Sequence, residues 1–218
     1  MQRLILNTSL LLFIVLASAC NNDDDVPEGT TGFGKVEVDG VEYQFTEGLI
    51  YDLGTGFIPE GEANHYLYEI LIANGDFYFD AQEGYFDLEN FNHLLYISAF
   101  SYDKNEFVVG EFNDNPRYSP GYQNNMFELA ALVVDINENG LWDEGDSVAS
   151  AIEGTILIEG ERPEYKLTFD LDFDKGSIMT GTVEGDFFFA DLNGNTIKDD
   201  EGQRSERMNK LLKRRLTE

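Results

Sequence analysis

The sequence has very little of the residue types that build redox and catalytic centres. It contains one cysteine and two histidines among 218 residues. A single cysteine excludes a disulfide bond within the chain and any CxxC motif. The chain also lacks a GxSxG nucleophile elbow, an HExxH metal motif and a glycine-rich phosphate loop. We therefore expect a protein without catalytic activity, although these absences do not exclude an enzyme that uses pairs of carboxylates.

Basic residues are scarce as well. The chain has 14 lysines and arginines against 42 aspartates and glutamates, which gives a formal net charge of −28. So acidic a chain repels the phosphates of nucleic acids, and we expect no nucleic-acid partner. Hydrophobic residues make up 42% of the chain and aromatic residues 13%, which predicts a folded body with a large core.

The first nineteen residues have the pattern of a signal peptide. Arg3 gives a positive start, and residues 4–19 are mostly apolar and end in small side chains. This stretch is short for a membrane-spanning helix. Its end, LASAC (residues 16–20), resembles the lipobox of bacterial lipoproteins, although Ala17 stands where that pattern usually has leucine. The resemblance implies a covalent lipid on Cys20 and a lipid anchor in the membrane. The alternative is an ordinary secretory signal with an incidental cysteine.

Residues 20–33 have the composition of a hydrated tether. The stretch NNDDDVPEGTTG (residues 21–32) is polar and acidic, and its proline and glycines oppose regular structure. An acidic run directly after the cysteine resembles the signal that sends lipoproteins of Bacteroidota-type bacteria to the outer face of the outer membrane. The resemblance implies a surface-exposed protein of the outer membrane. The alternative is a tether without a sorting role.

Alternating apolar and polar residues predict β-strands from residue 34 onward. Asp39 and Gly40 interrupt the alternation in KVEVDGVEYQF (residues 35–45), which predicts a hairpin with a type I′ turn. The stretch EYKLTFDLDF (residues 164–173) alternates most regularly, and one buried and one solvated face indicate an antiparallel sheet. Further strands are predicted over residues 65–73, 94–102, 106–112, 126–136, 151–160 and 177–190.

Eight to ten strands with no amphipathic helix before the C-terminal tail predict an all-β fold in a single domain, residues 34–203. We favour an antiparallel β-sandwich, and a lipocalin-like up-and-down barrel is the alternative. In style, the body resembles the small all-β lipoproteins of unknown function from Bacteroidota, although no specific motif carries this resemblance.

The C-terminal tail, residues 204–218, differs from the rest of the chain in charge. Its sequence RSERMNKLLKRRLTE holds six basic and two acidic residues, a net charge of +4. Met208, Leu211, Leu212 and Leu216 have helical spacing, which predicts a short C-terminal helix. Two roles are open for this helix: docking on anionic lipid or a partner, or lying against the acidic body of its own chain.

The motif DINENGLWDEGD, residues 135–146, is similar to the calcium loops of EF-hand proteins. Oxygen donors fall at positions 1, 3, 5, 7, 9 and 12 of the motif and a glycine falls at position 6. The predicted ligands are Asp135, Asn137, Asn139, the main-chain carbonyl of Leu141, Asp143 and Asp146. The motif departs from EF-hand loops because its last ligand is aspartate and because strands are expected on both sides. It therefore predicts a structural Ca²⁺ site in a hairpin, and a metal-free polar turn is the alternative.

A second motif, DLNGNTIKDDEG (residues 191–202), repeats the first less completely. The candidate ligands of this second metal loop are Asp191, Asn193, Asn195 and Asp199. Thr196 replaces the turn glycine and Gly202 replaces the last ligand, which favours a plain turn.

The sequence leaves several classes of function open. We favour a non-catalytic surface lipoprotein that binds a glycan or a protein, with aromatic residues such as Trp142, Tyr118 and Tyr122 as a contact platform. The alternatives are a glycan-active hydrolase that uses carboxylates and a lipocalin-like carrier of small molecules. His65 and His93 both lie at the start of a predicted strand, which favours surface positions for both.

Overall fold

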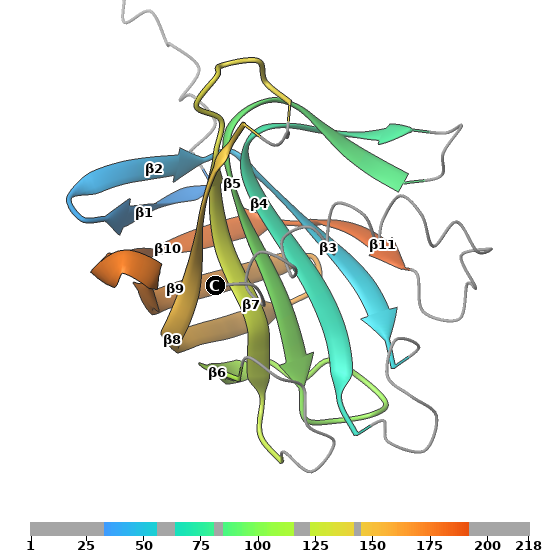
Figure 1. Cartoon of the computed structure of the whole chain (residues 1–218). Helices are drawn as coiled ribbons and strands as arrows, with labels where there is room; N and C mark the ends of the chain where they lie inside the picture. Colours follow the sequence, from blue (N-terminus) through green and yellow to red (C-terminus); the bar gives the residue numbers. More distant parts are fainter. Residues whose placement is uncertain (1–32, 56–63, 81–84, 116–122, 142–144, 192–218) are drawn as a thin grey trace, which may run out of the picture. The chain divides into compact units, whose positions relative to one another are not determined.

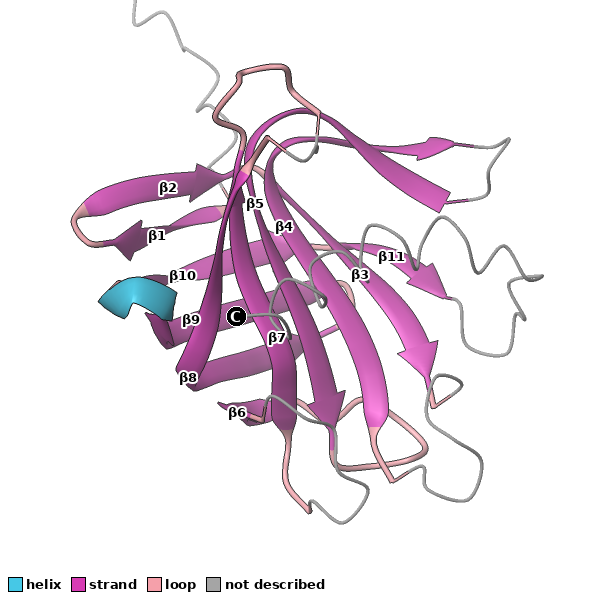
Figure 2. Ribbon diagram, in the orientation of Figure 1, coloured by secondary structure: helices cyan, strands magenta, loops and turns pink. Residues whose placement is uncertain are grey.

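The structure is a computed structural model that describes residues 33–55, 64–80, 85–115, 123–141 and 145–191. The described residues form eleven β-strands and one short 3-10 turn, as Figure 2 shows. The strands are β1 (Gly34–Val38), β2 (Val41–Phe45), β3 (Glu47–Gly54), β4 (Tyr66–Asp80), β5 (Tyr85–Ser101), β6 (Gly110–Asp114), β7 (Met126–Val134), β8 (Ser147–Glu161), β9 (Glu164–Phe173), β10 (Ile178–Asp186) and β11 (Phe188–Asp191). The prediction of an all-β fold is confirmed.

All eleven strands belong to one continuous sheet. From edge to edge, the strand order is β11-β3-β4-β5-β7-β6-β8-β9-β10-β1-β2. The pairs β11–β3 and β6–β7 are parallel, and the other neighbouring strands are antiparallel. The sheet is therefore mixed, with antiparallel pairing dominant as the alternation in the sequence predicts.

The sheet curls so that two groups of strands face each other (Figure 1). We call β3, β4, β5 and β7 the front layer, and β8, β9, β10 and β1 the rear layer. Strands β9 and β10 cross behind the front layer in Figure 1. Strand β8 joins the two layers, because its first residues pair with β7 and its later residues pair with β6 and β9. Its register with β9 shifts between Ala151 and Glu153. The two facing layers of the predicted sandwich are thus parts of one bent sheet.

The turns follow the local sequence. Asp39 and Gly40 have φ values of 50° and 83° between β1 and β2, so the predicted type I′ hairpin is confirmed. Gly181 shows why β10 needs a residue without a side chain, because a Cβ there would lie 2.5 Å from the Lys35 carbonyl oxygen. Neighbouring strands β10 and β1 therefore approach closely at this point.

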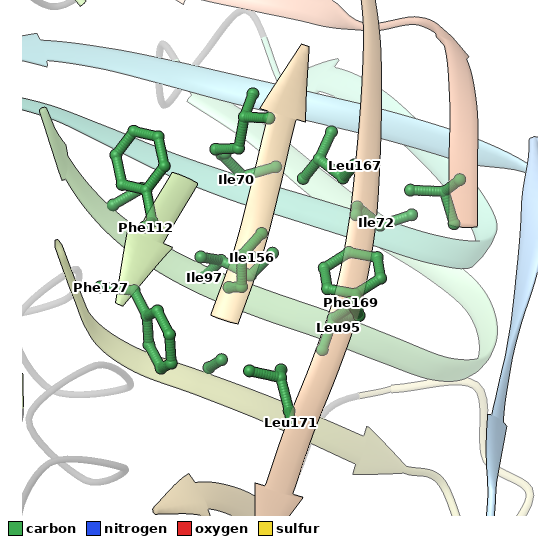
Figure 3. Close-up of a cluster of buried hydrophobic side chains, with 14 of the residues drawn as sticks. Ile70, Ile72, Leu95, Ile97, Phe112, Phe127, Ile156, Leu167, Phe169 and Leu171 are labelled. Carbon is green, nitrogen blue, oxygen red and sulfur yellow. The ribbon is translucent and has the colours of Figure 1, made fainter. Parts of the chain in front are cut away.

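Apolar side chains from both layers meet in one cluster that lies between them. Figure 3 shows this core in close-up. Its labelled members are Ile70, Ile72, Leu95, Ile97, Phe112, Phe127, Ile156, Leu167, Phe169 and Leu171, and all ten are at most 2% exposed. Burial of one such side chain contributes roughly 1.5–3 kcal/mol, so this cluster dominates the stability of the fold.

Several strands differ from their predicted bounds. Strand β3 has no counterpart among the predictions, and residues 106–109, predicted as part of a strand, precede β6. Residues 177–190 form two strands instead of one, because the chain breaks at Phe187 and β11 moves to the opposite edge, beside β3. The predicted C-terminal helix lies outside the described residues. No helix within the described part of the chain is long and apolar enough to span a membrane.

Candidate functional site

The predicted calcium loop connects β7 to β8. Val134, the last residue of β7, pairs with Ser147, the first residue of β8, so residues 135–146 form the loop of a long hairpin. The expectation that strands flank this motif is confirmed. Such a loop is closed at its base by the strand ladder, so its first and last residues, Asp135 and Asp146, lie close to one another.

Hydrogen bonds from the loop's own backbone wind it into a compact coil. The Gly140 amide donates to Oδ2 of Asp135 at 2.7 Å, and the Leu141 amide donates to Oδ1 of Asn139 at 2.7 Å. The Asn139 amide donates to Oδ1 of Asn137 at 3.1 Å. Gly140 has a φ of 71°, a value that glycine adopts without steric cost. Asn137 and Asn139 thus each accept from the amide two residues later, and Asp135 accepts from the amide five residues later.

Asp135 carries an oxygen atom whose hydrogen-bonding capacity is not used. The Asp135 side chain is 8% exposed, and its Oδ1 atom is buried without a hydrogen-bond partner. An ionised carboxylate oxygen in such a place costs several kcal/mol unless a cation or a donor compensates it, so the loop has a reason to bind a cation. Asp146, at the other end of the motif, is 4% exposed and brings a second buried carboxylate to the same hairpin.

The donor set of the loop fits calcium by its chemistry. Its described members are two carboxylates, the amide oxygens of Asn137 and Asn139, and the Leu141 carbonyl, all of them hard oxygen donors. Histidine, cysteine, aspartate and glutamate side chains form no group of three that could hold a metal ion within the described residues. A cation in the loop would therefore depend on the two asparagines and on main-chain oxygen as well as on the aspartates.

The loop is fixed to the neighbouring strand β5. The Asp135 amide donates to the Asn92 carbonyl at 2.9 Å. A Cβ on Gly140 would lie 3.2 Å from Cα of Asn90, so the loop backbone rests directly on β5. Asn90 has a φ of 54°, at an irregularity in the register between β4 and β5. The backbone of the 135–146 loop and the backbone of β5 near Asn90 and Asn92 therefore constrain each other.

The other predicted site residues are only partly described. Asp143 and the lipidation residue Cys20 lie outside the described residues. Of the second motif, Asp191 is described as the last residue of β11, where it pairs with Asp52 of β3. Its partners Asn193, Asn195 and Asp199 lie outside the described residues, so this second loop stays a prediction.

A polar cluster that the sequence did not predict lies where β3 ends and where β4 and β9 begin. Tyr66 of β4 hydrogen bonds to the Asp52 carboxylate, and Tyr68 shares a hydrogen bond with Tyr165 of β9. All three tyrosines are buried. Arg162, in the turn between β8 and β9, is close enough for its positive charge to act against the rise in the pKa of Asp52. Three segments distant in sequence meet here, and no local motif signals such a meeting.

Aromatic rings surround this polar cluster. The Arg162 guanidinium carbon lies 4.3 Å from the centre of the Phe189 ring, a cation–π contact. The rings of Tyr68 and Phe107 stack with their centres 3.9 Å apart. Burial raises the pKa of Asp52, and the Asp191 carboxylate adds to this rise, while the Tyr66 hydrogen bond opposes it. Burial also raises the pKa of Tyr68, so its hydroxyl stays protonated and can donate.

The surface positions expected for the histidines are wrong. His65 is fully buried, with its ring nitrogens within hydrogen-bond distance of Asn64 and Asn124. His93 is half-buried, and its Nε2 lies 2.7 Å from the Gln44 carbonyl oxygen. Burial lowers the pKa of both rings. A position at the start of a strand favours the surface, but residues distant in the sequence bury both rings.

We found no match between this chain and a protein-family model, a curated protein or a solved structure.

Proposed function

We propose that this chain is a lipid-anchored protein of the outer membrane surface, whose β domain is a non-catalytic binding or structural module with a structural calcium ion in its 135–146 loop. The lipobox-like sequence before Cys20 and the acidic run behind it support the anchor and the location. The observation that carries the calcium site is the buried Oδ1 atom of Asp135, which has no hydrogen-bond partner inside a coil of oxygen donors.

Calcium in this loop would stabilise the strands to which the loop is connected or hydrogen bonded. The cation would offset the charge of the buried Asp135 and Asp146 carboxylates, which otherwise weaken the hairpin. The loop is hydrogen bonded to Asn92 of β5, so a rigid loop stabilises β7, β8 and β5 together. The role we propose is therefore structural, and calcium takes no part in a reaction.

The packed interior supports a module of this kind over a lipocalin-like carrier. A carrier holds its ligand between the layers, in a cavity lined by apolar side chains. In this chain, the inward side chains of both layers instead contact one another in a single cluster (Figure 3). A ligand is better placed on an outer surface or at an end of the layers.

The calcium site is tested by thermal unfolding in millimolar Ca²⁺ and in excess chelator. A ligand that binds only the folded state stabilises it by about 2.7 kcal/mol at one hundred times its dissociation constant, so the melting temperature should rise by several degrees. Asp135→Asn should abolish this rise, whereas the exposed Glu138→Gln, in the same loop but not a predicted ligand, should keep it. An equal calcium response in both variants, or none in the unchanged chain, would refute the site.

The anchor is tested by fractionation of cells that produce the full chain. Cys20→Ser should move the protein from the membrane fraction to the soluble fraction, because the acyl chains supply the membrane affinity. Replacement of residues 23–25 by asparagine should leave the protein on the membrane but protect it from protease added to whole cells. An undiminished membrane fraction for Cys20→Ser would contradict the anchor and leave the calcium test unaffected.

The polar cluster around Asp52 favours glycan recognition as the second candidate function. Tyrosine hydroxyls, a carboxylate and an arginine beside aromatic rings are groups that recognise sugar hydroxyls and sugar rings. Calorimetric titration with glycans should show binding that Tyr68→Phe weakens, because a hydroxyl of the cluster is lost. Cleavage of the glycan that disappears in Asp52→Asn would instead indicate the hydrolase.

A further inference from the structure

The outward side of the front layer is apolar and buried. We define the outer cluster as Leu71 of β4, Leu94 of β5, and Leu129, Ala131 and Val133 of β7. The last four of these side chains are at most 2% exposed. All residues that pack with them come from β4, β5, β7 and β8, which are strands of the same sheet.

A face of a sheet is buried only when a second layer lies on it. The rear layer covers the inward face of β4, β5 and β7, and it lies on the other side of the sheet from the outer cluster (Figure 1). Within the described residues, no element forms a layer over the outer cluster. A contiguous apolar patch of this kind is rare on a free surface. Its cover therefore comes from a part of the chain beyond the described residues, or from another molecule.

We infer that residues 204–218 form an amphipathic helix that packs its apolar side on the outer cluster and completes a third layer of the fold. Met208, Leu211, Leu212 and Leu216 recur at intervals of three and four residues, which places them on one side of a helix. Sheets commonly bury a second apolar face under a helix. Lys210 and Lys213 fall on the opposite side of the same helix, which would face solvent.

The position of the last described strand favours this segment over the other parts of the chain that lie outside the described residues. β11 ends at Asp191 on the edge of the front layer, directly beside β3. The N-terminal part instead enters at β1, which lies in the rear layer. The internal segment 56–63 connects β3 to β4, and the segment 116–122 connects β6 to β7, so both begin and end near strand ends. Ala131 of the outer cluster lies in the middle of β7, away from these ends.

The dimensions agree with this placement. Four neighbouring strands span roughly 14 Å between the outermost axes. A helix over residues 204–218 is about 22 Å long, enough to cross all four. Residues 192–203 link Asp191 to this helix, and a chain of this length reaches up to about 40 Å when extended.

Charge complementarity adds to the fit. The tail, residues 204–218, carries a net charge of +4, whereas the whole chain has a formal net charge of −28. The surplus of basic residues in the tail also suits the acidic body.

Thiol labelling of the full chain tests this inference. In a Cys20→Ser background, a cysteine at Ala131 reports on the outer cluster, and a cysteine at the exposed Thr180 reports on the open face of the rear layer. We expect Ala131→Cys to react with a maleimide at least about 100-fold more slowly than Thr180→Cys, because labelling requires the cover to open. The double variant L211S/L212S should bring the two rates to within about tenfold of each other.

The matched variant K210S/K213S removes two charges from the solvent side of the same helix and should leave the protection of Ala131→Cys unchanged. If L211S/L212S abolishes the β-type circular dichroism spectrum while K210S/K213S keeps it, the apolar side of the tail is needed for the fold, which also supports docking.

Rapid labelling of Ala131→Cys in the otherwise unchanged chain would overturn the inference. Protection that survives L211S/L212S but falls on dilution would show that a second copy covers the face, and protection seen only with anionic vesicles would assign the cover to lipid. Either result would overturn it as well.

Discussion

The two layers of this sheet differ on their outer faces. The outward residues of β9 and β10 are polar except for the exposed Ile178, and Thr180 of β10 lies between Asp170 of β9 and Glu37 of β1. The outward residues of β5 and β7 are mostly apolar, and Leu94 and Leu129 are buried. The outer face of the rear layer is therefore exposed to water, whereas the outer face of the front layer, in the same continuous sheet, is apolar and buried.

This difference is encoded in the strand sequences. The strand β9, EYKLTFDLDF, alternates strictly, which is typical of a sheet with one wet face. The strand β7, MFELAALVV, is almost continuously apolar, which is typical of a strand that is buried on both sides. The contrast teaches that the alternation of a strand reports how many layers lie on it, even when both strands belong to the same sheet.

The largest effect should come from placing the same charge on each outer face. Leu129→Lys buries an ammonium group among apolar neighbours and should lower the free energy of unfolding by about 3 kcal/mol or more. Thr180→Lys places the same group between Asp170 and Glu37 and should change it by no more than about 0.5 kcal/mol. Urea unfolding of both variants measures the difference. Equal losses would show that the front layer is exposed like the rear layer.

How far the sequence predicts this molecule follows from how local each feature is. The Asp39-Gly40 hairpin and the alternating strand β9 depend on a few adjacent residues, and both predictions are confirmed. Strand β3, EGLIYDLG, has no clear alternation and takes its place only through its neighbours β4 and β11, so the sequence did not predict it. The path of β11 to the edge beside β3 is likewise set by distant residues.

The candidate sites divide in the same way. The turn geometry of the 135–146 loop arises within twelve consecutive residues, so the spacing of Asp, Asn and Gly in the sequence already predicts a turn there. The cluster of Asp52, Tyr66 and Tyr165 is assembled from three separate strands. Its members are ordinary residues for their strands, and only the fold brings them together.

A smaller effect should show that the inner faces of the two layers, unlike the outer ones, are equivalent. Ile97 of the front layer and Ile156 of the rear layer are both fully buried in the shared core. Ile97→Val and Ile156→Val each remove one buried methylene and should each cost about 0.5–1.5 kcal/mol. Urea unfolding of the two variants gives the comparison. A loss at only one of the two positions would contradict a single core shared by both layers.

The smallest effect concerns the contact between β5 of the front layer and β2, which leads out of the rear layer. The His93 ring packs edge-on against Tyr43 and Phe45 of β2, with ring centres 5.2 and 5.1 Å apart, and burial lowers its pKa. The unfolded chain, with an ordinary histidine pKa of about 6.5, therefore binds more protons than the folded chain as the pH falls below that value. The stability contributed by the neutral ring is present above about pH 6.5 and is lost as the pH decreases, because the ring must be protonated against its burial.

His93→Gln keeps a donor for the Gln44 carbonyl but cannot titrate, so the slope of unfolding free energy between pH 5 and about 7 should be shallower than in the unchanged chain. The slope is measured by urea unfolding across this pH range. The same slope in both proteins would mean that burial at the junction of the two layers does not lower the pKa of His93.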